Sequence, residues 1–163
     1  MNSTDSDYSL DNELELGDFV KIVVPLEQDE DGYPPIAAES LWAVPVREGE
    51  GYSVDNIPFF APRLSLKDIV KAATDEEGNL VFDRVISGGG HSTVRVIFFD
   101  DTGMPDFKSR IRSFDCNYEV GHKDTFLAID VPPQASYDDV VDYMIQKFRE
   151  GVLDFEESSI QHD

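Results

Sequence analysis

Apolar residues in the first half of this 163-residue chain gather in short, β-prone runs separated by turn-forming residues, a pattern typical of strands. Residues 18–26 and 39–46 are expected to pair as two strands across an acidic loop. Residues 52–61 contain Pro58, which disfavours a regular helix and favours an extended edge segment. These three segments predict a small, curled antiparallel sheet, with Trp42 buried against the central stretch of the chain.

The middle of the chain holds the longest run of apolar, β-prone residues and is the centre of the predicted fold. Ser65 and Asp68 have the spacing of a capping box and predict the start of a short helix of about two turns. Two strands follow at 80–86 and 93–99, separated by a glycine-rich connection. The second is apolar on both faces except at Arg95, so we place it centrally in a sheet. Because an unpaired buried charge is costly, the guanidinium of Arg95 then needs a partner or must face an open cleft.

The second half of the chain combines two helical patterns with a hairpin. Pro105 suits the first position of a helix whose apolar residues share one face. Segments 116–120 and 125–131 are expected to pair as strands across a short turn. A last helix is capped by Ser136 and stopped by Gly151. Its apolar stripe comprises Tyr137, Val140, Val141, Met144 and Phe148.

From Thr93 onward the order of expected elements is β-α-β-β-α, preceded by the 80–86 strand. This order is close to a ferredoxin-like arrangement with one strand displaced. The predicted fold class is therefore α+β, with a small antiparallel sheet at the N-terminal side joined to a ferredoxin-like β-α-β-β-α unit. Residues 1–11 are expected to be a disordered acidic tail, residues 12–155 a single domain, and residues 156–163 a polar tail.

Acidity is the strongest compositional feature, with a formal net charge of −21. Residues 1–50 contain 13 acidic and 2 basic side chains, residues 51–135 contain 13 and 9, and residues 136–163 contain 8 and 2. Negative charge is thus concentrated toward both ends. Such a field disfavours nucleic acid and anionic membranes and attracts basic proteins. Negative charge of this kind is also typical of proteins that need it only for solubility and of disordered acidic tails. A surface for a basic partner and a purely solubilising role therefore both stay open at this point.

The expected cellular location follows from three features that the sequence lacks. No run approaches the roughly 18 uninterrupted apolar residues of a membrane span. The polar, acidic start at 1–7 has no feature of a secretory signal. Cys116 is the single cysteine, which excludes an internal disulfide. We therefore expect a cytoplasmic protein of bacterial type.

The glycine-rich connection at 87–93 is the first candidate for ligand chemistry. Three consecutive glycines can turn backbone N–H groups toward an anion, and nearby polar side chains can add donors. The loop lacks the lysine of a phosphate-binding loop and does not open a helix, so a flexible β-connection remains the alternative. The candidate ligand-binding residues are Gly89, Gly90, His91, Ser92, Thr93 and Arg95.

Other reactive residue types do not assemble into a catalytic or metal site. Cys116 and His122 lie on one predicted hairpin and are expected to point apart, so no catalytic residue is assigned. The three histidines have no metal-ligand spacing, and no metal or cofactor is expected. The acidic loop lacks the ligand pattern of a calcium loop and is assigned instead to partner binding. Its candidate residues are Asp29, Glu30 and Asp31.

Three segments of the chain resemble an uncharacterised bacterial family, the domain of unknown function numbered 4265. They are Glu39-Ser40-Leu41-Trp42-Ala43, then Asn56-Ile57-Pro58-Phe59 leading into Leu64-Ser65-Leu66-Lys67-Asp68, and Gly90-His91-Ser92-Thr93-Val94-Arg95-Val96. The resemblance spans roughly residues 19–155, and similar sequences are expected to have glycine where this chain has Lys67. It implies a small, stand-alone bacterial protein. Because the family has no established activity, no catalytic residue is carried over.

Two functional hypotheses follow from these observations. The first is a non-enzymatic, acidic protein-binding module, such as an immunity or inhibitor protein that neutralises a basic partner. The second is a small-ligand or anion-binding domain, or an enzyme, that uses the loop at residues 88–95. The sequence contains no constellation that identifies a catalysed reaction.

Overall fold

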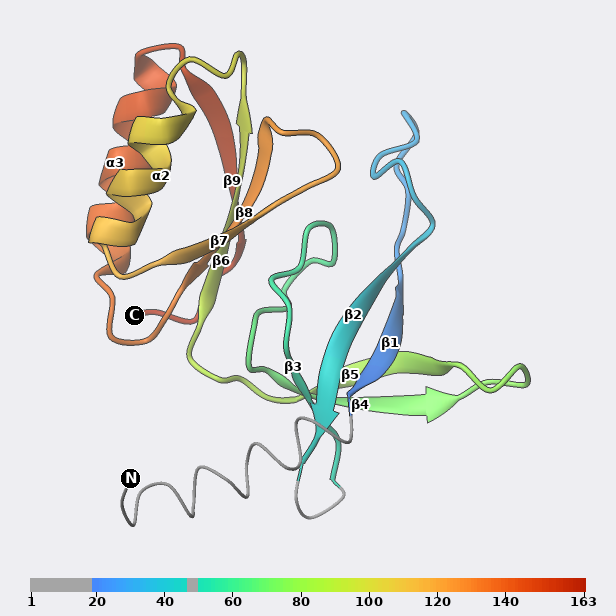
Figure 1. Ribbon diagram of the computed structural model, residues 1–163. Coiled ribbons are helices and arrows are strands. Elements are labelled where there is room, and N and C mark those ends of the chain that lie inside the picture. Colours follow the sequence, from blue (N-terminus) through green and yellow to red (C-terminus); the bar gives the residue numbers. More distant parts are fainter. Residues whose placement is uncertain (1–18, 47–49) are drawn as a thin grey trace. The chain divides into compact units, whose positions relative to one another are not determined.

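A computed structural model describes residues 19–46 and 50–163, which divide into two compact units (Figure 1). The first unit contains the described residues up to Asn56 together with residues 69–87. The second contains residues 57–68 and 88–163. The predicted disordered tail at 1–11 lies outside the described residues.

The first unit is a closed barrel of five short strands. Neighbouring strands are antiparallel from β1 to β5, and the barrel closes where β1 and β5 pair in parallel, with Ile22 opposite Leu80. Inward-facing residues such as Leu41, Val54 and Val70 are buried and alternate with outward-facing ones, as barrel strands require. The strands are β1 (Val20–Pro25), β2 (Ala38–Pro45), β3 (Tyr52–Val54), β4 (Ile69–Thr74) and β5 (Leu80–Ser87).

The second unit is a four-stranded antiparallel sheet in the order β7-β8-β6-β9. Two helices cover one face of this sheet (Figure 1). Phe107 and Ile111 from α2 and Val140 and Met144 from α3 are buried in the core between the layers. The elements are β6 (Ser92–Phe98), α2 (Met104–Ser113), β7 (Asn117–Val120), β8 (Phe126–Val131), α3 (Tyr137–Arg149) and β9 (Leu153–Ser159).

Most individual elements agree with the sequence-based prediction. The pairing of β1 with β2, the strands β5 and β6, and the hairpin of β7 and β8 are confirmed. Helix α3 begins where the Ser136 side chain accepts a hydrogen bond from the backbone N–H of Asp139. Gly151 follows α3 in a left-handed conformation, with φ of 76°, which suits a stop signal.

The short helix predicted after Ser65 is wrong. Only half of the expected box forms: the N–H of Ser65 donates to the Asp68 carboxylate, but the N–H of Asp68 donates to the Ser65 backbone carbonyl oxygen, and the Ser65 hydroxyl pairs with that of Thr93. The first two of these bonds close a single turn in which Lys67 has a φ of 71°. A left-handed residue cannot continue a right-handed helix. The chain instead enters strand β4 at Ile69, where β-branched residues favour extended backbone.

The predicted fold class is also wrong, because the structure is mostly β. A closed five-stranded barrel replaces the open curled sheet, and the strand at 80–86 belongs to this barrel as β5. The expected ferredoxin-like β-α-β-β-α unit is not what forms, since the second unit ends in a further strand, β9, paired along β6. Residues 156–159, expected to be tail, are part of that strand. Their polar sequence gives no local β signal, so only pairing with β6 reveals the strand.

Trp42 is exposed, contrary to its predicted burial. Strand β2 alternates strictly, so that Leu41 and Ala43 face the barrel interior while Trp42 faces outward with 44% of its surface exposed. A narrow five-stranded barrel filled by residues such as Ala43 and Val54 has no room for an indole. Shifting the pairing by one residue would exchange every inward side chain for an outward one.

Candidate functional site

The glycine connection of the second unit lies against the turn at residues 65–68, around the carboxylate of Asp68. This side chain is 1% exposed. Its Oδ2 accepts the backbone N–H of Ser65 at 2.9 Å. Its Oδ1 accepts the backbone N–H of Gly89 at 3.1 Å and the side-chain amide of Gln161 at 2.7 Å. The side-chain carbonyl oxygen of Gln161 in turn accepts the backbone N–H of Gly90 at 2.8 Å.

The backbone at Gly88 and Gly89 lies so close to neighbouring atoms that there is no room for a side chain. A Cβ on Gly89 would lie 2.5 Å from the carbonyl oxygen of Lys67, and one on Gly88 would lie 2.4 Å from the Gln161 side chain. Gly90 has a φ of 87°, in the left-handed region that glycine adopts without strain. The three glycines therefore fit the loop onto its own unit, which is a structural use of their small size.

The anion-binding hypothesis needs the N–H groups of Gly89 and Gly90, and both already donate to side chains of the second unit. An internal carboxylate thus occupies the position that the sequence suggested for an external anion. Asp68 and Gln161 were missed as members of this cluster. The box spacing of Ser65 and Asp68 was a usable signal, whereas nothing in the sequence near Gln161 indicated its role.

Ser92 and His162 form a second part of the buried cluster. The Ser92 hydroxyl oxygen accepts the backbone N–H groups of Gln161 and His162, at 2.8 Å and 3.3 Å. It lies 2.6 Å from Nδ1 of His162, whose Nε2 lies 2.9 Å from the carbonyl oxygen of Pro132. A carbonyl oxygen only accepts, so Nε2 carries a proton. The imidazole also stacks on Tyr137, with ring centroids 5.3 Å apart.

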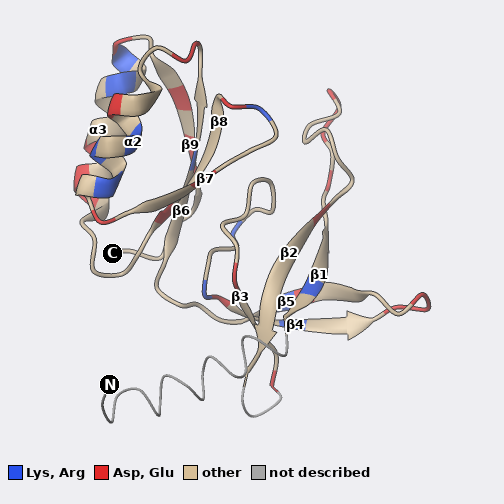
Figure 2. Ribbon diagram, viewed as in Figure 1, with Lys and Arg blue, Asp and Glu red and all other residues tan. Residues whose placement is uncertain are grey.

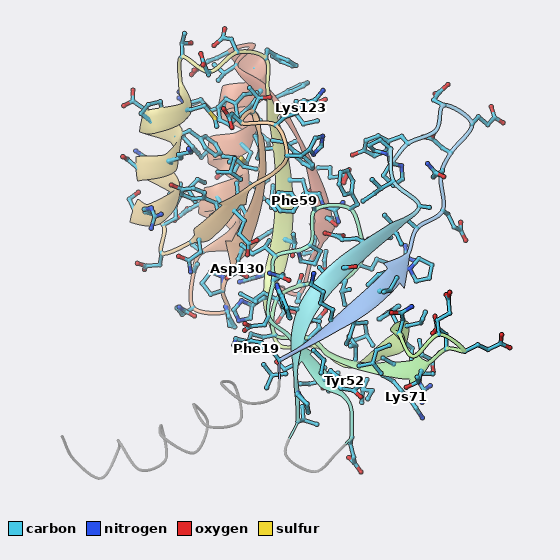
Figure 3. The ribbon with its side chains drawn as sticks, turned by 45° about the vertical axis from the view of Figure 1, so that its right-hand side comes forward. Phe19, Tyr52, Phe59, Lys71, Lys123 and Asp130 are labelled. Carbon is cyan, nitrogen blue, oxygen red and sulfur yellow. The ribbon has the colours of Figure 1, made fainter. Side chains whose placement is uncertain are left out.

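His91 and Asp130 form the pair that most resembles a catalytic arrangement. Nδ1 of His91 lies 2.7 Å from the buried carboxylate of Asp130. Asp130 belongs to β8 and is labelled in Figure 3. Burial raises the pKa of Asp130, and the hydrogen bond and charge of His91 oppose that rise. A carboxylate of this kind fixes the orientation of an imidazole, as in many acid–base sites. The hydroxyls of the neighbouring residues have other partners: that of Ser92 lies against His162, and that of Thr93 lies 2.6 Å from the Ser65 hydroxyl.

Arg95 is 5% exposed, and both terminal nitrogens of its guanidinium have partners in the second unit. Nη2 donates to the carbonyl oxygen of Ala61 and to the hydroxyl of Ser158, and Nη1 lies 3.6 Å from the Glu156 carboxylate. The guanidinium therefore joins three segments of the second unit. Together with Ser92 and Thr93, this side chain is part of the packed interior of the unit.

Cys116 and His122 do not form a nucleophile–base pair. Cys116 is buried among core residues, with Sγ 3.8 Å from the carbonyl oxygen of Phe114. Burial and the charges of Asp130 and Asp115 raise the pKa of Cys116 to about 12, so the reactive thiolate is disfavoured. The His122 ring instead packs near the rings of Phe60 and Phe126.

The predicted partner-binding residues lie on a rigid turn between β1 and β2. The Oδ1 atom of Asp29 accepts the backbone N–H groups of Asp31 and Tyr33, both at 2.9 Å. The N–H of Asp29 also donates to the Tyr33 carbonyl oxygen at 2.7 Å. Gly32 completes the turn with a φ of 79°. The side chains of Asp29, Glu30 and Asp31 are exposed.

A second acidic turn, between β4 and β5, repeats this construction. Oδ1 of Asp75 accepts the N–H groups of Glu77 and Asn79 at 2.9 Å and 2.8 Å, and Gly78 has a φ of 89°. The carboxylates of Asp75, Glu76 and Glu77 are exposed. Both turns belong to the barrel and appear as red loop tips in Figure 2. Its Asp-Glu-Glu-Gly run matches the Asp-Glu-Asp-Gly of the first turn.

The outward face of β1 and β2 carries an exposed aromatic pair. Phe19 and Trp42 are 42% and 44% exposed, and their rings meet edge to face with centroids 6.3 Å apart. The ammonium of Lys21, directly opposite Trp42 in the register, lies 5.0 Å from the centroid of the indole. Figure 3 shows Phe19 at the start of β1. We call Phe19, Lys21 and Trp42 the aromatic face of the barrel.

Within residues 19–46 and 50–163, no group of three or more histidine, cysteine, aspartate and glutamate side chains is placed to hold a metal ion. Over the same part of the chain, no helix has the length and apolar character needed to cross a membrane.

Fold and surfaces together define a mostly β protein of two units, one with a buried polar cluster and one that exposes carboxylates and aromatic rings. The chain belongs to the family described as "Domain of unknown function (DUF4265)", whose profile matches residues 39–155. It is similar in fold to a hypothetical protein from Neisseria gonorrhoeae of known crystal structure, with a TM-score of 0.75 and 24% sequence identity. That likeness covers 88% of this chain and 96% of the other. No curated protein matches the chain.

Proposed function

We propose that this protein is a non-enzymatic binding module that uses the acidic surface of its barrel to hold a basic protein partner, as an immunity or inhibitor protein does. The observation that supports the proposal is the pair of acidic turns built to the same plan. In each, an aspartate side chain fixes the backbone while the neighbouring carboxylates project into solvent. Rigid presentation lowers the entropy lost when a partner binds.

The charge of the barrel agrees with this use. Its described residues contain eleven acidic and three basic side chains, a net charge of −8. The second unit contains sixteen acidic and nine basic side chains over a longer stretch, a net charge of −7. Helices α2 and α3 carry five of those nine cations (Figure 2). The density of uncompensated negative charge is therefore higher on the barrel, and such a surface speeds encounter with basic proteins.

The test compares the wild-type protein with a variant in which the first acidic turn is neutralised, Asp29→Asn, Glu30→Gln and Asp31→Asn. Asparagine keeps the acceptor oxygen that closes the turn, so the backbone is preserved. Each immobilised protein is incubated with a native lysate of its source organism at low and at moderate salt, and retained proteins are identified. We expect the wild-type protein to retain a basic protein whose affinity falls by about tenfold or more in the variant.

The matched control has the same change of charge in the second unit, Asp101→Asn, Asp124→Asn and Asp142→Asn. These three side chains are exposed. The control should bind the basic partner as the wild type does. Equal retention by the turn variant and the wild type, or equal losses in the turn variant and the control, would show that the acidic turn is not the binding surface.

A further inference from the structure

We infer that the aromatic face of the barrel is the anchor point for an arginine side chain of the basic partner, which replaces Lys21 over the indole of Trp42. This inference rests on the proposed function, because it names the contact by which the same unit would recognise its partner. It adds a specific chemistry to the general attraction of negative charge, and it assigns a role to an exposed tryptophan that the packing of the barrel does not explain.

The geometry of Trp42 suits an anchor. Large exposed aromatic side chains are enriched at the centres of protein interfaces. The outward direction of this indole follows from the alternation of β2, and Phe19 packs edge-on against it. The indole of Trp42 therefore points outward from β2, and Phe19 packs against one side of it.

The backbone of Trp42 is held on both sides. Its N–H donates to the side-chain oxygen of Asn56, and its carbonyl oxygen accepts the N–H of Asp55 at 2.8 Å. On the other side, β2 pairs with β1 at Lys21. A ring on a fixed backbone loses little freedom on binding, which is the property of an anchor residue.

The present occupant of the indole face indicates the chemistry of its ligand. The Lys21 ammonium lies 5.0 Å from the ring centroid, within the range of a cation–π contact. Tryptophan offers the strongest face for such contacts. A guanidinium is less strongly hydrated than an ammonium and stacks flat on aromatic rings, so an incoming arginine can take the place of the lysine. The net charge of −8 on the described barrel favours the approach of a cationic segment.

The experiment uses two probes, a nona-arginine and a nona-lysine peptide, each carrying a fluorescent label for anisotropy. Both peptides should bind the full chain at low salt through the acidic surface. Nona-arginine should bind about five times more tightly than nona-lysine, because a guanidinium is less strongly hydrated than an ammonium and stacks flat on the indole, and because it also pairs bidentately with carboxylates. Because the chain contains a single tryptophan, the emission of Trp42 reports directly on the site. Unlabelled nona-arginine should change that emission more than nona-lysine does.

Three variants decide whether the indole causes the preference. In Trp42→Ala the preference for nona-arginine should fall by at least about half, to the part that bidentate pairing with carboxylates provides, and in Trp42→Phe some of the lost preference should be restored. Lys21→Gln frees the ring and should strengthen nona-arginine binding. Phe99→Ala removes a second exposed aromatic ring, from the other unit, and should change nothing. Circular dichroism of each variant establishes that the fold is retained.

The outcomes separate this inference from the proposed function. If neutralising Asp29, Glu30 and Asp31 weakens both peptides while Trp42→Ala keeps the arginine preference, the anchor is overturned and the acidic surface stands. If an uncharged peptide of the same length changes Trp42 emission as strongly as nona-arginine, a cationic ligand is overturned. If neither peptide depends on the acidic turn, the proposed function fails together with the inference.

Discussion

The two units use their polar and aromatic residues in opposite ways. In the second unit, Asp68, Ser92, Thr93, Arg95 and Asp130 are buried, and each is hydrogen-bonded to backbone or side-chain groups of the same unit. In the barrel, the conspicuous carboxylates lie on turns in water, and the single tryptophan lies on the surface. Groups already satisfied inside a fold have little capacity left for a ligand. Groups that are exposed on a rigid frame keep their capacity to bind a ligand.

This contrast changes which residues are candidates for function. The three glycines, the histidine and the arginine at 88–95 attract attention in the sequence because such residues often bind ligands. In the structure their hydrogen-bonding groups hold the second unit together. The barrel residues that attract less attention, two acidic turns and one aromatic face, are the ones with exposed capacity for binding.

Removing the buried carboxylate should have the greatest consequence. Asp68→Ala leaves the N–H groups of Ser65 and Gly89 and the Gln161 amide without their acceptor. Each unsatisfied buried donor costs about 1–3 kcal/mol, so we expect a loss of about 3–5 kcal/mol in the free energy of unfolding. Asp29→Ala makes the same change on the exposed turn, where water replaces the lost acceptor, and should cost about 1 kcal/mol. Denaturant titration of both variants measures this. Equal losses would contradict the contrast between the two units.

Glycine substitutions should show the next largest difference. In Gly89→Ala the new methyl group would lie 2.5 Å from a backbone oxygen, and overpacking of this kind costs about 1–3 kcal/mol. In Gly78→Ala no atom lies within 4 Å of the new group, so only the left-handed φ of 89° opposes the change, at about 1 kcal/mol. Thermal unfolding of the pair should place Gly89→Ala lower. A tolerated Gly89→Ala would mean that the loop is not pressed against residue 67.

The buried thiol offers a pH-dependent test of the second unit. Its pKa is raised to about 12 by burial, whereas an unfolded cysteine titrates near 8.5, so the folded state favours the protonated thiol. The corresponding stability is fully present below the unfolded pKa and is lost as the pH rises toward 12. Between about pH 8 and pH 10, the stability of the wild type should fall by about 1–2 kcal/mol relative to Cys116→Ala. Parallel pH profiles of the two proteins would show that the thiol is accessible and ionises.

The smallest expected effect concerns the strained residue beside Asp68. Lys67 has a φ of 71°, which costs a residue with a side chain about 1 kcal/mol, and glycine removes that cost at some loss of entropy in folding. Because the change also removes the attraction between the Lys67 ammonium and the Asp130 carboxylate, Lys67→Gly should alter the free energy of unfolding by no more than about 0.5 kcal/mol in either direction. Lys71→Gly, in strand β4, should lower stability by about 0.5–1 kcal/mol. Differential scanning calorimetry compares them. A clear loss in Lys67→Gly would mean that the lysine side chain contributes more than its backbone costs.

Local signals in the sequence determined much of the secondary structure. The Ser136 cap, the Gly151 stop, the helical spacing of Phe107 and Ile111, and the turn sequences between paired strands all concern residues a few positions apart. Physical preferences of this range act before any tertiary contact forms, so they can be identified in one chain. The negative charge of the acidic turn and the resemblance to the family were likewise evident from the sequence.

Features that depend on contacts between distant parts of the chain were decided by the tertiary structure alone. Closure of the barrel depends on Ile22 meeting Leu80, and the cluster around Asp68 depends on Gln161, which lies 93 positions away. The outward direction of Trp42 depends on the register of a whole strand. Such pairings are selected by the total packing of a unit, because the free energy of each is small beside the entropy of bringing distant segments together. A single sequence contains no local pattern that records them.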